Sequence, residues 1–337
     1  MKKIFLSVIV CIGCFTASYA QQDDKLLQTM KQELSYDMEQ LKKQELKPYY
    51  MSMRVEDKYQ LNVSSSFGVT DGVQGGRMRL FTPQIRIGDK TLDNFKYNTQ
   101  GVQTYQGMPM STPTALSLDD NATDAIKASM WKEVNSRYNF ACAQYNAAKA
   151  KAATSVANED KAPCFSDAPV EHYYEAPIPA AAYKIDVEAW KQKLNQVSAA
   201  FKSCPELQQG NATLSYEVVR TYLVNTDGTD VVQNRICGRV LLSALVVAED
   251  GMKLPLNMDY FAYDLDSLPS VEKMVVDAKD MADRLMKLKN APVADPYTGP
   301  AMLSGPASGV FFHEIFGHRL EGHRLKEGGE TFKKMVG

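Results

Sequence analysis

Apolar residues recur at three- and four-residue steps in several stretches of the chain, which is the spacing of an amphipathic helix. The first stretch carries Leu26, Leu27, Met30, Leu34 and Met38, and Pro48 is predicted to close its helix. Three more stretches follow the same rule, and the longest of them fades into an Ala- and Lys-rich polar end. We therefore expect four amphipathic helices, within residues 23–46, 117–160, 187–201 and 270–290.

Polar and apolar residues alternate in two other parts of the chain, which is the pattern of half-buried strands. The first part covers residues 49–89 and is interrupted at Asp71-Gly72 and Gly75-Gly76, which predicts a meander of antiparallel strands. The second part covers residues 212–265 and is interrupted by the Asp-Gly pairs at 227–228 and 250–251, dipeptides that accept the positive φ of hairpin turns. We predict an α+β fold, in which antiparallel sheets from two strand meanders pack with the amphipathic helices.

A Pro-rich segment at residues 161–181 separates these parts and is expected to be a surface connection. It contains His172, which as one exposed loop histidine indicates no site by itself.

The N-terminus is typical of a secretory signal. Lys2 and Lys3 precede the apolar run "IFLSVIVCIGCF", and small residues stand at Ser18 and Ala20. We predict residues 1–20 to be a signal peptide, cleaved after Ala20, and the protein to be exported, periplasmic or extracellular. A lipoprotein signal with Cys14 as the lipidated residue is an alternative, but Cys11 stands where such signals usually have leucine.

Composition narrows the set of partners. The formal net charge is −2 and no basic stripe is present, so a nucleic-acid partner is not expected. After the signal there is no apolar run of the roughly 18 residues that a membrane span requires. The mature chain keeps four cysteines, Cys142, Cys164, Cys204 and Cys237. In an oxidising compartment they could form two disulfides, and the most local pairing joins Cys142 to Cys164 and Cys204 to Cys237. Alternatively, they could remain free and buried.

Candidate chemistry is concentrated in the segment "FFHEIFGHRLEGHR", which holds three of the four histidines of the chain. Pro306 precedes it by a few residues and suits the first turn of a helix, so His313 is expected on a helix. His318 follows five residues later, and on a regular helix two positions five apart differ by about 140° in direction and cannot reach one ion. Either a π-bulge or a helix that ends at Gly317, with this glycine in the left-handed cap conformation, would bring the two rings together.

If the rings converge, the residue types fit zinc hydrolysis. Neutral imidazoles of His313 and His318 are ligands that Zn²⁺ prefers, and an open position would hold a water whose pKa falls toward neutrality. Glu314 would then take the proton of this water and deliver it to a leaving amine. The alternative is a histidine-rich polar helix end with solvated charges, because the spacing differs from the standard HExxH pattern.

The segment "YTGPAMLSGPASGVFFHEIFGHRLEGHR" closely resembles the TldD/PmbA family, once called modulators of DNA gyrase, and "FFHEIFGHRLEG" matches its extended HExxxH signature. Upstream, "PYYMSMRVED", "SSSFG", "RIGDKTLDN" and "VNTDGT" resemble its N-terminal domain in an exported branch. The resemblance implies a zinc metallopeptidase that acts on peptides or unfolded segments, with Zn²⁺ bound by His313 and His318 and with Glu314 as the catalytic acid/base. It also implies a homo- or heterodimer with a TldD/PmbA-like subunit, enclosing a cavity.

The same resemblance divides the chain and predicts an incomplete site. Residues 21–300 correspond to the N-terminal α+β domain, and residues 301–337 to the start of the metallopeptidase region. In the family the third zinc ligand is a cysteine of a C-terminal domain, so we expect this chain to be truncated before that domain, with little peptidase activity alone and with the apolar residues around His313 exposed. His323 could substitute as the third ligand.

Two other readings remain. The chain could be a non-catalytic partner subunit that binds peptides, which the missing third ligand favours and Glu314 disfavours. It could also be an exported scaffold with an incidental histidine cluster.

Overall fold

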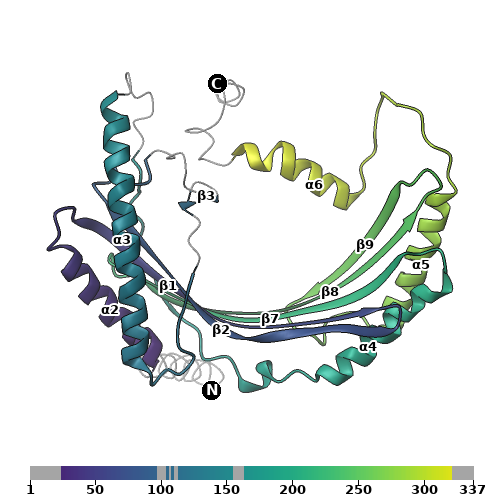
Figure 1. The fold of residues 1–337 in the computed structure, drawn as a ribbon, viewed down its shortest axis with the longest axis horizontal. Helices are drawn as coiled ribbons and strands as arrows, with labels where there is room; N and C mark the ends of the chain where they lie inside the picture. Colours follow the sequence, from purple (N-terminus) through teal and green to yellow (C-terminus); the bar gives the residue numbers. More distant parts are fainter. Residues whose placement is uncertain (1–23, 97–103, 106–107, 110–112, 155–162, 321–337) are drawn as a thin grey trace, which may run out of the picture.

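The computed structural model describes residues 24–96, 104–105, 108–109, 113–154 and 163–320. In this part of the chain, helices lie at both ends of a long sheet (Figure 1). Their bounds are α2 Lys25–Leu41, β1 Pro48–Ser66, β2 Val69–Ile87, β3 Thr104–Tyr105, β4 Met108–Pro109, β5 Thr114–Ala115, α3 Thr123–Thr154, β6 His172–Tyr174, the 3₁₀ turn η1 Ala180–Tyr183, α4 Val187–Ala199, η2 Ala200–Ser203, β7 Gln209–Asn225, β8 Asp230–Val247, β9 Lys253–Ala262, α5 Val271–Lys289, α6 Gly305–Ile315 and η3 Gly317–Leu320.

The predicted α+β class is confirmed, and the two groups of strands form a single sheet. Among the described residues this sheet has seven strands in the order β5-β2-β1-β7-β8-β6, with β9 also paired to β8. The two groups meet where β1 pairs antiparallel with β7, from Ser52 opposite Asn225 to Ser66 opposite Asn211. Only the short β6 runs parallel to its neighbour, β8.

The sheet is strongly curved, and helices α2, α4 and α5 lie along its convex side, while α3 crosses its edge at β2 (Figure 1). Because successive side chains of a strand point to opposite faces of the sheet, one set of apolar side chains packs against the helices. One hydrophobic core joins α4 and α5 to β7, β8 and β9, with Leu194, Val197 and Phe201 fully buried. A second core joins α2 and α3 to β1 and β2, and Met30 of α2 and Phe81 of β2 are fully buried in it.

A buried ion network lies on this helix-covered face. Arg77 reaches Asp57 with Nε and Nη2 at 2.7 and 2.8 Å, and Arg79 reaches the same carboxylate at 3.1 and 2.6 Å. Arg79 and Asp57 are almost completely buried. Asp57 lies directly opposite Arg79 in the pairing register, and Arg77, opposite Tyr59, is its diagonal neighbour, so the network favours this alignment of the first hairpin.

The first hairpin differs from the sequence-based prediction. Its turn lies at Phe67-Gly68, where both residues have positive φ (45° and 83°), and not at the Asp-Gly or Gly-Gly pairs. Those pairs lie inside β2, which is 19 residues long, although the pairing with β1 shifts register at Asp71, between Thr70 and Gly72. The backbone pairing of two long strands outweighs the low strand propensity of the glycines. A Cβ at Gly75 would come within 2.5 Å of the Gln60 carbonyl oxygen, so the close approach of β1 requires glycine there.

Two further expectations need correction. Pro48 does not end a helix but begins β1, and α2 ends earlier, at Leu41. The Pro-rich connection contains β6, so His172 lies on a strand, with Nδ1 2.6 Å from Asp230 Oδ1. Of the two alternatives for the cysteines, the structure has the free form: all four cysteines of the described part of the chain are free, although only Cys237 is buried. The signal-peptide prediction concerns residues 1–20, which lie outside the described residues.

The predicted turns and helices of the second half agree with the structure. Gly228 and Gly251 adopt positive φ (103° and 87°) in the two hairpin turns. Asp186 and Ser270 cap α4 and α5 by accepting hydrogen bonds from Ala189 N and Lys273 N. Within the described residues, no helix combines the length and apolar character that crossing a bilayer requires.

Candidate metal centre

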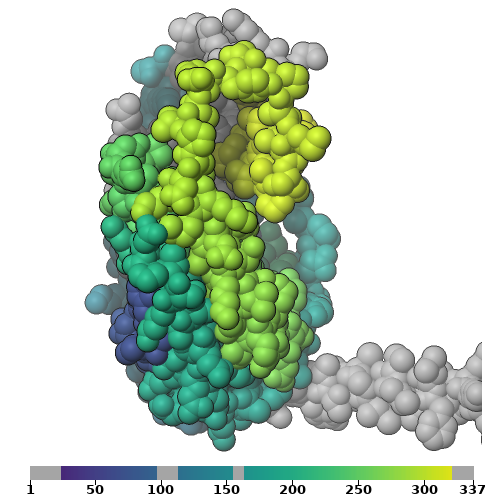
Figure 2. Space-filling view, turned by 90° about the vertical axis from the view of Figure 1, so that its right-hand side faces the viewer, coloured from purple at the N-terminus to yellow at the C-terminus, as the bar shows by residue number. Residues whose placement is uncertain are grey.

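The candidate metal centre is carried by α6, which follows an irregular segment after α5. Ser304 stands at the N-cap position and Pro306 lies in the first turn, as predicted for a proline at a helix start. None of the residues of α6 is buried. Figure 2 shows the helix, in yellow, near the top of the molecule and open to solvent. Its side chains are therefore accessible to a ligand from outside.

The winding of this helix breaks at Phe316, two residues before His318. Phe316 has φ −120° and ψ −52°, well away from helical values, although its N–H still donates to the Phe312 carbonyl at 3.0 Å. Its own carbonyl then accepts the N–H groups of both Arg319 and Leu320, at 3.0 and 3.2 Å. A new turn, η3, thus starts from Phe316 in a direction different from that of α6.

This break brings the two histidines together. The ring centroids of His313 and His318 lie 4.5 Å apart, with 72° between the ring planes. Glu314 lies between them, with carboxylate oxygens 3.9 Å from His313 Nε2 and 3.8 Å from His318 Nε2. One ligand atom from each of the three residues lies within 4.8 Å of the others. The convergence expected for a five-residue gap is therefore present.

The geometry of the break is neither of the two that we expected. In the described span 305–320 there is no π-bulge, and Gly317 is not among the residues with positive φ. A Cβ placed on Gly317 would meet nothing closer than 3.8 Å, so glycine is not sterically required there. The distortion falls on Phe316, and the change from α to 3₁₀ winding redirects the chain at a helix C-terminus, where such turns are common.

The three side chains fit a divalent cation. Two imidazole nitrogens bound to one Zn²⁺ at about 2.1 Å in a tetrahedral arrangement lie about 3.4 Å apart, so the rings must approach by only about 1–2 Å. His313 and Glu314 are mostly exposed and His318 is about one-third exposed, so rotamer changes can supply this movement. Glu314 is within reach of both rings, where it could accept a proton from a water beside the ion.

The third ligand suggested by the sequence, His323, lies outside the described residues. No cysteine joins the metal-ligating group in the described part of the chain, and His172, on β6, is paired with Asp230, on β8. The described residues therefore supply two imidazoles and one carboxylate.

The apolar residues around the motif are exposed, as predicted. Val310, Phe311, Ile315 and Phe316 all have more than 40% of their surface accessible. A contiguous exposed apolar patch is typical of a surface that contacts another protein or domain.

Comparison with known proteins found similarity only to solved structures. No family model and no curated protein matches this chain. Several solved structures match at low identity. Three of them are a proposed modulator of a DNA gyrase from Thermotoga maritima (10% identity, TM-score 0.43), TldE from Thermococcus kodakarensis (12%, 0.42) and a proposed modulator of DNA gyrase from Bacteroides thetaiotaomicron (8%, 0.43).

The matches cover 75–76% of this chain but only 47–49% of each solved structure. The chain thus spans about half the length of the proteins that it matches. At these identities and TM-scores the activity has to be inferred from the side chains of the site.

Proposed function

We propose that this protein is a zinc-dependent metallopeptidase that acts on peptides or unfolded segments. The observation that carries the proposal is the convergence of His313, Glu314 and His318 where α6 breaks at Phe316. Two histidine ligands with an adjacent glutamate as general base are the arrangement of many zinc metalloproteases. The similarity of "FFHEIFGHRLEG" to the HExxxH signature of the TldD/PmbA family supports the same activity.

In this proposal each residue has a separate role. The imidazoles of His313 and His318 hold Zn²⁺. A bound Zn²⁺ supplies Lewis acidity at the carbonyl of the scissile peptide. The Glu314 carboxylate accepts a proton from the attacking water and returns it to the leaving amine nitrogen. The Glu314 carboxylate suits this role because it lies less than 4 Å from both imidazole rings.

Catalytic zinc sites normally have three protein ligands, so a further ligand is needed to complete this one. Within the sequence His323 is the candidate, and the resemblance to the TldD/PmbA family points instead to a cysteine of a C-terminal domain. The same resemblance supports residues 21–300 as an N-terminal domain, a TldD/PmbA-like partner in a dimer, and export directed by residues 1–20. The exposed apolar residues of α6 are consistent with a surface that such a domain or partner covers.

Metal analysis of the purified protein tests the proposal. We expect one equivalent of Zn²⁺ in the unmodified protein and in Glu314→Gln, because glutamine keeps the size of the side chain and the glutamate is not a ligand. We expect His313→Ala and His318→Ala to weaken Zn²⁺ binding by more than about a hundredfold, since loss of even an outer hydrogen-bond partner costs 10–100-fold. His172→Ala is the matched control and should leave binding unchanged.

Hydrolysis of an unstructured peptide, measured on the same variants, separates catalysis from binding. Glu314→Gln should retain the metal and lose activity, by about 10²–10⁴-fold for removal of a general base. Absence of stoichiometric metal in the unmodified protein would reject the metal site. Metal binding without hydrolysis of the peptide would favour a non-catalytic peptide-binding subunit.

A further inference from the structure

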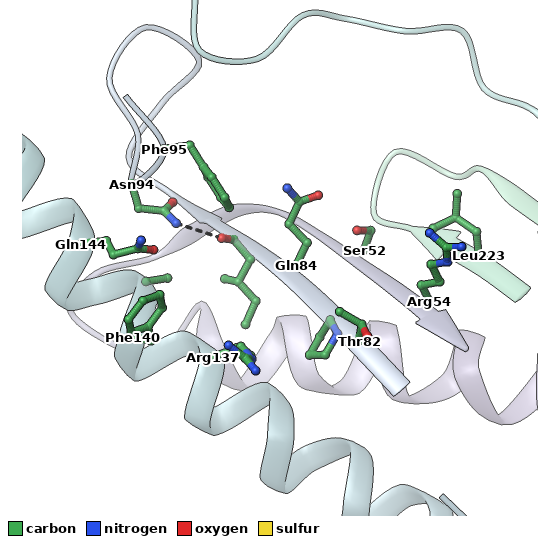
Figure 3. A pocket seen from close by; sticks show the side chains of 13 residues that line it. Ser52, Arg54, Thr82, Gln84, Asn94, Phe95, Arg137, Phe140, Gln144 and Leu223 are labelled. Carbon is green, nitrogen blue, oxygen red and sulfur yellow. Dashed lines mark hydrogen bonds between the residues drawn. The ribbon is translucent and has the colours of Figure 1, made fainter. Parts of the chain in front are cut away.

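Strand β9 forms an open edge of the sheet. It pairs with β8 on one side over its whole length, and no strand in the described part of the chain pairs with its other side. The opposite edge of the sheet is covered. There β5 pairs with β2, and α3 passes beside β2 and leaves a pocket of about 350 Å³ that is lined in part by Ser52, Gln84 and Gln144 (Figure 3). An uncovered strand presents backbone N–H and C=O groups to which a further strand can add.

The outward-facing backbone groups of β9 follow from its hairpin with β8. Ala248 N donates to the Met252 carbonyl at 2.9 Å, so the backbone of Met252 faces β8. Because this orientation alternates along an antiparallel strand, the backbone groups at positions 253, 255, 257, 259 and 261 face away from β8. Pro255 fits this phase, since it has no N–H to contribute to the pairing with β8. The free hydrogen-bonding groups of the edge therefore lie at the odd-numbered positions.

Only the first half of this edge is protected against strand addition. Proline discourages addition at position 255, whereas positions 257, 259 and 261 offer N–H and C=O groups without interruption. The one charge among them, Asp259, is paired with Arg239 of β8 at 3.3 Å. Phe261 is 55% exposed and Tyr263 is 72% exposed, and their ring centroids lie 5.2 Å apart. The second half thus combines free backbone groups with an exposed aromatic pair.

A groove of about 410 Å³ lies beside the same strand, between β9 and α5. Its lining comes from β9 and the C-terminal half of α5: Pro255, Leu256, Arg284, Leu285, Lys287 and Leu288. Among the described residues none of β8 lines it, which places the groove at the outer side of β9. Leu288 is 52% exposed. A side chain of an added strand that points to this face can therefore enter the groove against Leu256 and Leu288.

A second copy of the same edge is a poor partner for it. If two copies of β9 paired antiparallel about Asp259, the two carboxylates would lie directly opposite each other, which destabilises a strand pair. If they paired about Asn257, the Asp259 carbonyl of each copy would face Pro255 of the other, which has no N–H to donate. Pairing about Met258 would leave the Phe261 carbonyl in the same situation. A strand of different sequence, placed opposite positions 257–261, meets neither obstacle.

We infer that the edge from Asn257 to Phe261 binds an extended segment of polypeptide as an additional β-strand, with an apolar side chain of that segment in the groove beside Leu288. In this mode of recognition main-chain hydrogen bonds supply the affinity, and pockets for alternate side chains supply the specificity. Peptides and unfolded segments are the substrates in the function proposed above, and the inference rests on that proposal for the identity of the occupant. Binding at the edge needs no metal, so it can be measured separately from hydrolysis.

Fluorescence anisotropy with alternately N-methylated peptides tests the inference. The probe is fluorescein-labelled Val-Thr-Thr-Val-Thr-Leu-Lys-amide, which in antiparallel register places its first valine opposite Phe261 and its leucine opposite Leu256. EDTA is present, so that bound metal cannot cleave the probe. N-methyl groups on the third and fifth residues of the probe point at β9 and remove two hydrogen bonds, whereas those on the second and fourth residues point away from it.

We expect methylation of the third and fifth residues to weaken binding by at least about tenfold, and methylation of the second and fourth residues to weaken it by less than about threefold. A probe that docks only through its side chains would respond equally to both changes. Equal effects, the reverse order, or no saturable binding of the unmethylated probe at millimolar concentration would each overturn the inference.

Variants locate the bound probe on β9. Asp259→Pro removes an outward N–H that the pairing with β8 does not use, and should weaken binding by at least about tenfold. Asp259→Asn keeps this N–H and is the matched control, with unchanged binding. If Asp259→Pro does not fold, as judged by circular dichroism, the methylated probes decide the question on the unmodified protein. Unchanged binding in a folded Asp259→Pro protein would place the probe elsewhere and reject the edge.

The groove is tested by exchanging the leucine of the probe for alanine. We expect the unmodified protein to prefer leucine by about tenfold and Leu288→Ser to lose most of this preference. Val276→Ser, at a position that is 61% exposed on the same helix, should keep it. Zn²⁺ binding should be the same in all these variants. Loss of peptide binding with Zn²⁺ binding intact therefore rejects the edge alone, and absence of Zn²⁺ binding with peptide binding intact rejects the metal centre alone.

Discussion

Replacement of Asp57 by asparagine is expected to lower the free energy of unfolding by about 3–5 kcal/mol, the range for removal of one partner of a buried ion pair. Asparagine has nearly the volume of aspartate, so the loss of stability measures the effect of removing the negative charge. Without the Asp57 carboxylate, Arg79 keeps Asp120, at 2.8 Å, and the Ser117 carbonyl. Asp120 is half exposed and cannot offset the burial of the guanidinium. Urea denaturation monitored by circular dichroism measures the change.

A matched control separates this effect from a general loss of surface charge pairs. Asp259 pairs with Arg239 on the same sheet, at 3.3 Å, but both side chains are about half exposed. Asp259→Asn should therefore change stability by less than about 1 kcal/mol. If the two substitutions cost the same, the Asp57 network contributes no more than a surface pair. A double variant with Asp57→Leu and Arg79→Met should recover part of the loss, since it removes both buried charges, while Arg77 is partly exposed and can be hydrated.

The sequence predicted most helices because each has a single apolar face. Leu26, Met30 and Leu34 repeat at helical spacing, and all three are buried against the sheet in α2. The Asp-Gly pairs at 227–228 and 250–251 predicted both hairpin turns of the second strand group, because positive φ is accessible to glycine at little cost. Local signals of this kind need no knowledge of distant residues.

The sequence did not predict features that depend on pairing between distant segments. The glycines at 72, 75 and 76 read as turns, but the register with β1 holds them inside a long strand. Nothing local to Arg77 and Arg79 indicates that β1 places the Asp57 carboxylate where both can reach it. The pairing of β1 with β7, which merges the two strand groups into one sheet, is likewise a long-range contact without a local signature.

The candidate metal centre was predicted in part. The residue types His313, Glu314 and His318 indicated the chemistry, and the five-residue gap indicated that the helix had to break. The position of the break could not be deduced, since glycine is the usual helix terminator and the distortion falls on Phe316 instead. The pocket beside α3 was not predicted at all, because Ser52, Gln84 and Gln144 come from three elements and are unremarkable in each.

The second large effect concerns pH, and it originates at Asp37 on α2. This residue is fully buried, and neither of its carboxylate oxygens has a hydrogen-bond partner in the part of the chain that the structure describes. Burial and, to a smaller extent, the charge of Glu33 one turn earlier together raise the pKa of Asp37 to about 7. Glu33 is itself nearly buried and has Lys127 at 3.4 Å as its cation.

The sign of the effect follows from this raised pKa. Between pH 4 and 7 the folded protein keeps the Asp37 proton while the unfolded chain, with a pKa of about 3.8, has lost it. The contribution of Asp37 to stability is therefore complete below about pH 4, falls as the pH rises, and levels off above about pH 7. A shift of about three pKa units corresponds to a loss of up to about 4 kcal/mol across this window.

Asp37→Asn removes the ionisation and keeps the shape of the neutral acid. We expect the variant and the unmodified protein to unfold at similar urea concentrations at pH 4, and the variant to be more stable by about 2–4 kcal/mol at pH 8. Other carboxylates titrate over the same range in both proteins. The difference between the two plots of unfolding free energy against pH therefore isolates the contribution of Asp37. Glu39→Gln, on the exposed face of the same helix, should show no such divergence. A difference between Asp37→Asn and the unmodified protein that stays constant from pH 4 to pH 8 would mean that Asp37 titrates normally in the folded state.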